Sequence, residues 1–176
     1  MYINTALQKG RLFLSTTTTR GKMMKTSDID RILRRNLVTA PFYLGCFAAD
    51  RIPISPPHYP HCMVVNTDPG WAKGAHWVSI YCLSPTHVEY FDSLGIWAPP
   101  SEPICTFLSR FQWVRFVSRP VQSPYTDTCG KHAIFFLYHR CSGVPMERII
   151  SRMLLGKHSA DSAVTEFVRE NIFAAA

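Results

Sequence analysis

The residue types needed for acyl transfer by a thiol occur along this chain as His76, Asp92, Gln122 and Cys129. A cysteine becomes a useful nucleophile when an imidazole and a helix N-terminus stabilise its thiolate, and a carboxylate can hold that imidazole in one tautomer. A side-chain amide and a backbone N–H can stabilise the oxyanion of the tetrahedral intermediate. Each residue alone is more often structural, so the prediction depends on whether the fold brings the four together.

Cys129 opens the segment CGKHAIFFLYHRC, which is apolar on nearly every side and is followed by Ser142-Gly143. This pattern predicts a buried central helix with a glycine stop. Residues 126–128 are candidate caps, and the sulfur would lie at the positive end of the helix dipole. Gly130 would leave room beside the sulfur for a substrate backbone. The other cysteines fall in predicted loops, in strands or at the C-terminus of this helix, so Cys129 is the predicted nucleophile.

The segments HWVSIYC and THVEYFD, joined by LSP, predict a β-hairpin. Pairing Cys82 with Thr86 places His76 directly opposite Asp92, at the end of an apolar face. Directly opposed Cβ atoms are ~4.5–5.5 Å apart, so the imidazole could reach the carboxylate. Glu89 would point to the other face. Asp92 also begins DSLG, a sequence typical of a plain strand-end turn.

The remaining pattern predicts an α+β fold, in which a mixed or antiparallel central sheet packs against the buried central helix. Runs rich in β-branched and aromatic residues predict strands in CMVVN, HWVSIYCL, HVEYFDS and QWVRFVS, and the Pro-rich stretch 38–60 predicts loops and a short strand. Ser27 and Asp30 resemble a capping box that opens a helix of about ten residues. Two further helices are expected over Pro145–Leu155 and from Asp161, as its cap, to about Ile172.

The composition is typical of one globular domain, with 176 residues of which 47% are hydrophobic and 18% charged. No apolar run approaches the ~20 residues that span a bilayer, and the first residues lack the apolar core of a signal peptide. We therefore expect a soluble monomer that does not associate with membranes, with its six cysteines as free thiols. The His58, His61 and Cys62 spacing in HYPHC matches no standard zinc module, so we expect no metal site.

Most of the net charge of +7 lies near the N-terminus. Residues 1–35 hold eight Lys or Arg against two Asp, whereas the other 141 residues hold eleven against ten. We predict a flexible basic arm over residues 1–25 and a single domain over residues 26–176. The arm could bind DNA by neutralising phosphates. A solvated tail, or an upstream extension of a reading frame that starts at Met23 or Met24, explains the same charges equally well.

Several motifs together resemble the adenovirus-type cysteine endopeptidases (adenain), which are related to the proteases that act on SUMO and other ubiquitin-like proteins. The resemblance covers about residues 27–145 and includes FYLG, SPPHYPHCMVVNT, GAHW, YFDSLG and VQSPYTDTCG. Six residues separate Gln122 from Cys129, as in the adenovirus branch, whereas the SUMO branch typically has five. The third member of the site is Asp92, nearer the SUMO pattern than the Glu usual in adenoviruses.

The resemblance implies a papain-like site in an adenain-like fold. His76 would be the general base, Asp92 its orienting partner and Cys129 the nucleophile. Gln122 and the backbone N–H of Cys129 would form the oxyanion hole, and Trp77 would pack beside the site. Either an Asp or a Glu can fix the imidazole tautomer, so the mechanism tolerates aspartate in the third position.

The implied function is that of a viral maturation endopeptidase, which cleaves capsid and core precursors after Gly-containing sites in the virion and the host nucleus. The chemistry would need no cofactor. Adenovirus enzymes are stimulated by DNA and by a capsid-derived peptide joined through a disulfide. Here Phe111 holds the linking position and Cys105 is the nearest thiol, so a disulfide-linked activator is not expected. A deubiquitinase or SUMO-type protease, and an inert protease-like fold that binds nucleic acid, remain as alternatives.

Overall fold

The computed structural model describes residues 23–55, 58–96, 99–156 and 159–173. Residues 1–22 of the expected arm lie outside the described residues, so the prediction of a flexible arm stays a prediction for them. Met23 and Met24 are described, and both pack against the hydrophobic core. Residues 23 and 24, which the prediction places in the arm, thus contact the domain.

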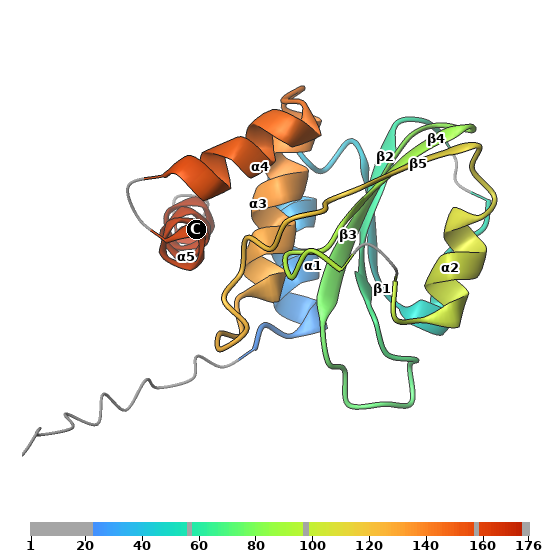
Figure 1. Ribbon diagram of the computed structural model, residues 1–176, viewed down its shortest axis with the longest axis horizontal. Coiled ribbons are helices and arrows are strands. Elements are labelled where there is room, and N and C mark those ends of the chain that lie inside the picture. Colours follow the sequence, from blue (N-terminus) through green and yellow to red (C-terminus); the bar gives the residue numbers. More distant parts are fainter. Residues whose placement is uncertain (1–22, 56–57, 97–98, 157–158, 174–176) are drawn as a thin grey trace, which may run out of the picture.

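The chain forms an α+β domain built on one five-stranded sheet, as predicted (Figure 1). Neighbouring strands follow the chain order β1-β2-β3-β4-β5. The outer pairs β1/β2 and β4/β5 are parallel, whereas β2/β3 and β3/β4 are antiparallel, so the sheet is mixed. The elements are α1 (Thr26–Arg35), β1 (Tyr43–Ala48), a short 3-10 helix η1 (Ala49–Arg51), β2 (His61–Asn66), β3 (Trp77–Ser84), β4 (His87–Phe91), α2 (Glu102–Leu108), β5 (Trp113–Phe116), α3 (Cys129–Cys141), α4 (Met146–Leu155) and α5 (Ala160–Phe173).

Helices cover both faces of the sheet. Helix α2 lies on one side, and α1, α3, α4 and α5 lie on the other (Figure 1). Side chains along β3 alternate between the two faces of the sheet, as expected for a strand. Val78 and Ile80 pack toward α2, whereas Trp77 and Tyr81 pack toward α3. Burial on both faces explains why the central strands are apolar at successive positions rather than at every second one.

Helix α3 is the buried central helix that the sequence predicts, and it begins at Cys129. The ring of Phe136 on α3 stacks on Phe91 of β4, with centroids 4.4 Å apart and planes 3° from parallel. The hydroxyl of Ser79 on β3 donates to the carbonyl of Ala133, one turn after Cys129. These contacts fix the start of α3 against the central hairpin.

One local prediction is wrong, and one helix is missed. The helix α1 starts at Thr26 with Lys25 as its N-cap and no side-chain capping bond, so Ser27 and Asp30 form no capping box. Asp30 instead accepts a hydrogen bond from Arg34, one turn later. Helix α2 was not predicted, because its seven residues are too short to display a clear helical period.

Candidate active site

His76 and Asp92 meet at one end of the β3/β4 hairpin. His76 immediately precedes β3 and Asp92 immediately follows β4, so antiparallel pairing brings both to the same end of the sheet. The Nε2 atom of His76 lies 2.8 Å from Oδ1 of Asp92, which is 1% exposed. The same carboxylate oxygen accepts a hydrogen bond of 2.8 Å from the backbone N–H of Leu94. The Asp92 oxygen therefore holds the imidazole and a tight turn together.

The expected register of this hairpin is wrong by two residues. Ile80 pairs with Tyr90, and Cys82 pairs with Val88, so His76 is not directly opposite Asp92. A β-bulge at Leu83 and a tighter connection replace the expected three-residue loop. An even shift keeps each residue on its predicted face, which is why the apolar clusters are nevertheless as expected.

Both residues lie beyond the last paired positions, where strict alternation no longer decides the direction of a side chain. Within the strands, the predicted face of His76 is the α2 face, whereas Cys129 lies on the α3 face. After β4 the chain turns at residues 92–95, where Gly95 has a φ of 69° and its N–H bonds the Asp92 carbonyl. A side chain at Gly95 would collide with the backbone of Pro120. The DSLG turn and the bond to His76 thus coexist.

Cys129 is the first residue of α3 and is 3% exposed. Burial alone would lower the pKa of His76, but hydrogen bonds with Asp92 and Cys129, and the charges of both, raise it to about 9. An imidazole that remains protonated at neutral pH beside a sulfur stabilises a thiolate. Since Nε2 is engaged by Asp92, Nδ1 is the ring nitrogen that remains for the sulfur. The structure therefore joins His76 to Asp92, and the raised pKa of His76 indicates that Cys129 lies near enough to influence the ring.

Gln122 is held at both ends of its side-chain amide. Its Oε1 accepts a hydrogen bond of 2.6 Å from the Ser93 hydroxyl, and its Nε2 donates to the carbonyl of Thr126 at 2.8 Å. A carbonyl oxygen can only accept, so the nitrogen must face Thr126. The backbone N–H of Gln122 also bonds the Ser93 carbonyl. Among the described residues, the second hydrogen of Nε2 has no acceptor, so this hydrogen is available to a further acceptor beside the loop that leads to Cys129.

Gly130 and Trp77 both pack against other parts of the domain. For Gly130 this differs from the expectation. A side chain at Gly130 would meet Ile29, Met24 and Trp77, so the glycine allows close packing on α3 rather than opening space for a substrate backbone. Trp77 is 5% exposed, and its Nε1 donates to the carbonyl of Met24 at 3.1 Å. Trp77 is thus a core aromatic that fastens the segment before α1 beside the start of α3.

Two of the expected helix caps, Thr128 and Asp161, are wrong. Thr128 is the N-cap residue of α3 but makes no side-chain capping bond, because its hydroxyl donates to Asp161. Asp161 does not cap α5, since Ser159 accepts the hydrogen bond from the backbone N–H of Ser162. Asp161 turns toward the loop before Cys129 instead. No local sequence signal indicates this role, because the partners are more than 28 residues apart.

The remaining cysteines have environments that differ from that of Cys129. Burial raises the pKa of Cys46 and of Cys82 to about 12, and Cys105 is exposed. The sulfur atoms of Cys62 and Cys141 lie 3.8 Å apart and share a hydrogen bond, but they form no disulfide. Within the described residues, no three metal-binding side chains are grouped to hold an ion, and none of the described helices has the length and apolarity needed to cross a bilayer.

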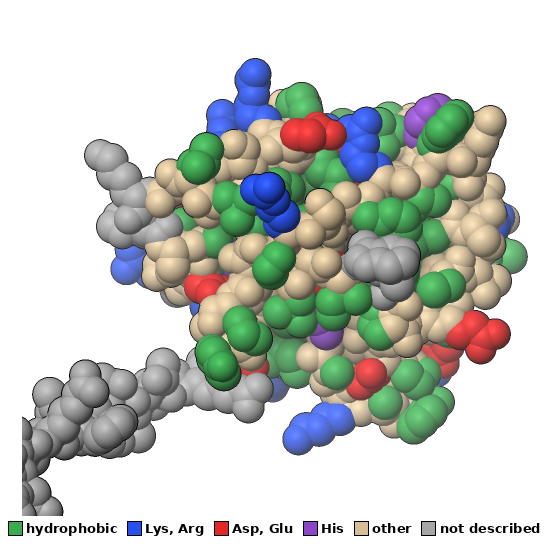
Figure 2. Space-filling model, in the orientation of Figure 1, with side chains coloured by type: hydrophobic (Ala, Val, Ile, Leu, Met, Phe, Trp, Pro, Cys, Tyr) green, Lys and Arg blue, Asp and Glu red, His purple; other side chains and the backbone are tan. Residues whose placement is uncertain are grey.

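Charged side chains on the visible face of the domain are dispersed. Figure 2 shows Lys and Arg side chains at separate places with hydrophobic and polar surface between them. This agrees with the near balance of charges after residue 35, where the sequence has eleven basic and ten acidic residues. The basic excess of the chain therefore lies mainly in and near the segment outside the described residues.

Comparison with solved structures supports a protease-like α+β fold. The central domain of the uncharacterized Lpg1148 protein from Legionella pneumophila aligns with a TM-score of 0.55 at 14% identity, over 88% of this chain and 98% of that one. The ASFV pS273R protease aligns with a TM-score of 0.52 at 17% identity, over 83% of this chain. This chain spans 66% of the length of that protease.

Sequence comparison adds no further assignment. No protein-family model matches the chain, and no curated protein matches it. At 14% and 17% identity, these likenesses concern the fold alone. Nothing in the structural likeness is specific to the adenovirus-type branch.

Proposed function

We propose that the protein is a cysteine endopeptidase in which Cys129 is the nucleophile. The proposal rests on the hydrogen bond between His76 and the buried carboxylate of Asp92, near a cysteine that begins a helix. Helix position, imidazole and carboxylate are the three features that activate a thiol. The likeness of the fold to a protease structure supports the same conclusion.

The mechanism follows from the atoms available. The Cys129 thiolate attacks the peptide carbonyl carbon, forming a C–S bond and an oxyanion. The backbone N–H of Cys129 and the free N–H of Gln122 would stabilise that oxyanion. His76, protonated, gives its proton to the leaving amine nitrogen as the C–N bond breaks. The neutral ring then takes a proton from water as the water oxygen attacks the thioester carbonyl. The C–S bond breaks, which releases the carboxylic acid product and restores the thiolate. Asp92 keeps Nε2 of the ring protonated and the ring oriented.

The proposed substrates are capsid and core precursors with Gly-containing cleavage sites, cut in the virion or the host nucleus. This part of the proposal rests on the resemblance of the sequence motifs to the adenovirus-type enzymes. DNA bound by residues 1–25 is proposed as a stimulant, whereas a disulfide-linked peptide is not. The test is cleavage of a peptide of the form Leu-x-Gly-Gly by wild type, with Cys129→Ala as the inactive control.

A SUMO-type or ubiquitin-type protease is the second candidate. The observation that favours it is the third member of the site, because aspartate at position 92 matches that branch. Cleavage of SUMO and ubiquitin conjugates, measured beside the capsid-type peptide, separates the two candidates. A protein that cleaves none of these substrates, and in which Cys129 is labelled no faster than Cys105, would be an inert protease-like scaffold.

A further inference from the structure

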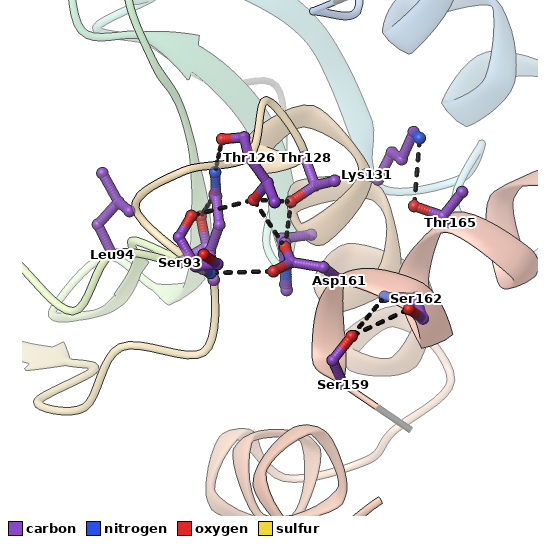
Figure 3. Close-up of polar contacts among 12 residues, drawn as sticks. Ser93, Leu94, Thr126, Thr128, Lys131, Ser159, Asp161, Ser162 and Thr165 are labelled. Carbon is purple, nitrogen blue, oxygen red and sulfur yellow. Dashed lines mark hydrogen bonds and ion pairs between the residues drawn. The ribbon is translucent and has the colours of Figure 1, made fainter. Parts of the chain in front are cut away.

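Asp161 lies where α5 meets the loop that delivers Cys129. Figure 3 shows its carboxylate among side chains of that loop, with Thr126 and Thr128 beside it. The Thr128 hydroxyl and Nε2 of His132 donate to Oδ1, the latter at 3.0 Å. The hydroxyl of Thr126 lies 3.1 Å from the same oxygen. Oδ2 accepts the backbone N–H of Ser123 at 3.0 Å.

These partners span the whole loop between Gln122 and α3. Ser123 directly follows Gln122, Thr128 directly precedes Cys129, and Thr126 lies between them. The carbonyl of Thr126 accepts the hydrogen bond from Nε2 of Gln122. One carboxylate on α5 therefore fixes both ends of the loop and the residue that orients the Gln122 amide.

The surroundings of Asp161 keep its carboxylate charged and hydrogen-bonded. Its side chain is 15% exposed, and His132 is fully buried beside it. Burial alone would raise the pKa of Asp161, but hydrogen bonds from His132, Thr128 and Ser123 lower it to about 2. The carboxylate is therefore ionised at any pH used to assay activity, and a charged acceptor forms stronger hydrogen bonds than a neutral one.

We propose that Asp161 is a positioning residue for the oxyanion hole, holding the loop so that the amide of Gln122 and the backbone N–H of Cys129 point to one place. The inference rests on the proposed function and extends it. It gives α5 a role in catalysis, although α5 contributes none of the three residues His76, Asp92 and Cys129. An asparagine at position 161 would keep one oxygen but turn an N–H group toward the Ser123 N–H, so the loop would lose that bond.

The test compares Asp161→Asn with wild type and with Glu166→Gln, which removes an exposed carboxylate from the same helix. Removal of an oxyanion donor typically costs ~10²–10³ in kcat, so a loosened donor should cost about ten- to a hundredfold. KM for the Gly-containing peptide should change by less than about twofold, because substrate binding does not use the oxyanion. Glu166→Gln should behave as wild type.

Two further measurements separate positioning from a general loss of structure. A peptide aldehyde forms a tetrahedral adduct that uses the oxyanion hole, so its affinity should fall by about the same factor as kcat. Alkylation of Cys129 by iodoacetamide does not use that hole, so its rate should stay within about twofold of wild type. Thr126→Val, which removes a single hydroxyl, should show a smaller effect in the same direction.

The possible outcomes distinguish a failure of this inference from a failure of the proposed function. Unchanged kcat and aldehyde affinity in Asp161→Asn would overturn the inference while leaving the proposed function intact. If the alkylation rate and turnover fell equally in both Asp161→Asn and Thr126→Val, these side chains would affect the reactivity of Cys129 or the fold. That result would also overturn the inference. A wild-type protein with no turnover and no selective labelling of Cys129 would instead refute the proposed function and, with it, this extension.

Discussion

Replacing Asp92 by asparagine should lower the pH at which activity is lost on the alkaline side. The proposed mechanism needs a protonated His76 beside the thiolate, so the rate falls as pH rises through the pKa of that ring. The pKa is raised from 6.5 to about 9, which corresponds to roughly 3 kcal/mol in favour of the imidazolium at ~1.4 kcal/mol per pH unit. Asp92 and Cys129 share that stabilisation. Removing the buried charge 2.8 Å from the ring should therefore move the alkaline limb down by about one pH unit or more.

The assay is kcat/KM for a Gly-containing peptide between pH 5 and 10, with folding monitored by circular dichroism. Asparagine has the shape of aspartate and keeps an oxygen for Leu94, so the fold should be preserved while kcat/KM at neutral pH falls about ten- to a hundredfold. Asp28→Asn, which removes an exposed carboxylate on α1, is the charge-matched control and should change neither quantity. An Asp92→Asn profile whose alkaline limb coincides with that of wild type would show that Asp92 does not set the protonation of His76.

Further predictions concern residues outside the triad. Glu89→Ala should lower the free energy of unfolding in urea by about 3 kcal/mol, because Arg140, bonded to Glu89 at 2.6 Å, would remain buried without its partner. Since that pair lies near the far end of α3, kcat/KM at low denaturant should be retained. Ser93→Ala removes the donor to Oε1 of Gln122 and should lower kcat about tenfold with little change in KM. Asp161, with a pKa of about 2 in the folded protein and 3.8 as its ordinary value, contributes stability above pH 4 that is lost as pH falls toward 2. The stability difference between wild type and Asp161→Asn should therefore be about 2 kcal/mol at pH 6 and should narrow between pH 4 and 2.

The sequence predicted the parts of the structure that depend on local pattern. The long apolar segment from Cys129 indicated a buried helix, and the strand runs around residues 62–66 and 113–116 were located closely. The mixed sheet packed on a central helix is confirmed, because apolar runs interrupted by glycine, proline and serine fix element type well. The positions of His76 and Asp92 at adjacent strand ends were predicted by the same pattern.

The parts that depend on tertiary contacts were not predictable. The register of the hairpin depends on a β-bulge at Leu83. The sequence LSP is compatible both with a bulge followed by a tight turn and with a three-residue loop, so it does not predict which of them forms. The contacts of Gly130 with Met24 and Trp77 join segments about 50 to 100 residues apart, so a small residue there could equally have made room for a substrate. Asp161 looked like a helix cap because aspartate at a helix start usually is one.

The most direct test of the account is a thiol titration of the wild-type protein with iodoacetamide at neutral pH, with the labelled cysteine identified by mass. Cys105 is the exposed internal reference, and the high pKa of Cys46 and of Cys82 keeps those thiols unreactive. We expect Cys129 to be labelled about tenfold faster than Cys105 despite its burial, and His76→Ala to abolish this advantage. Equal labelling of Cys129 and Cys105, or a Cys129 rate unchanged in His76→Ala, would contradict the claim that this cysteine is an activated nucleophile.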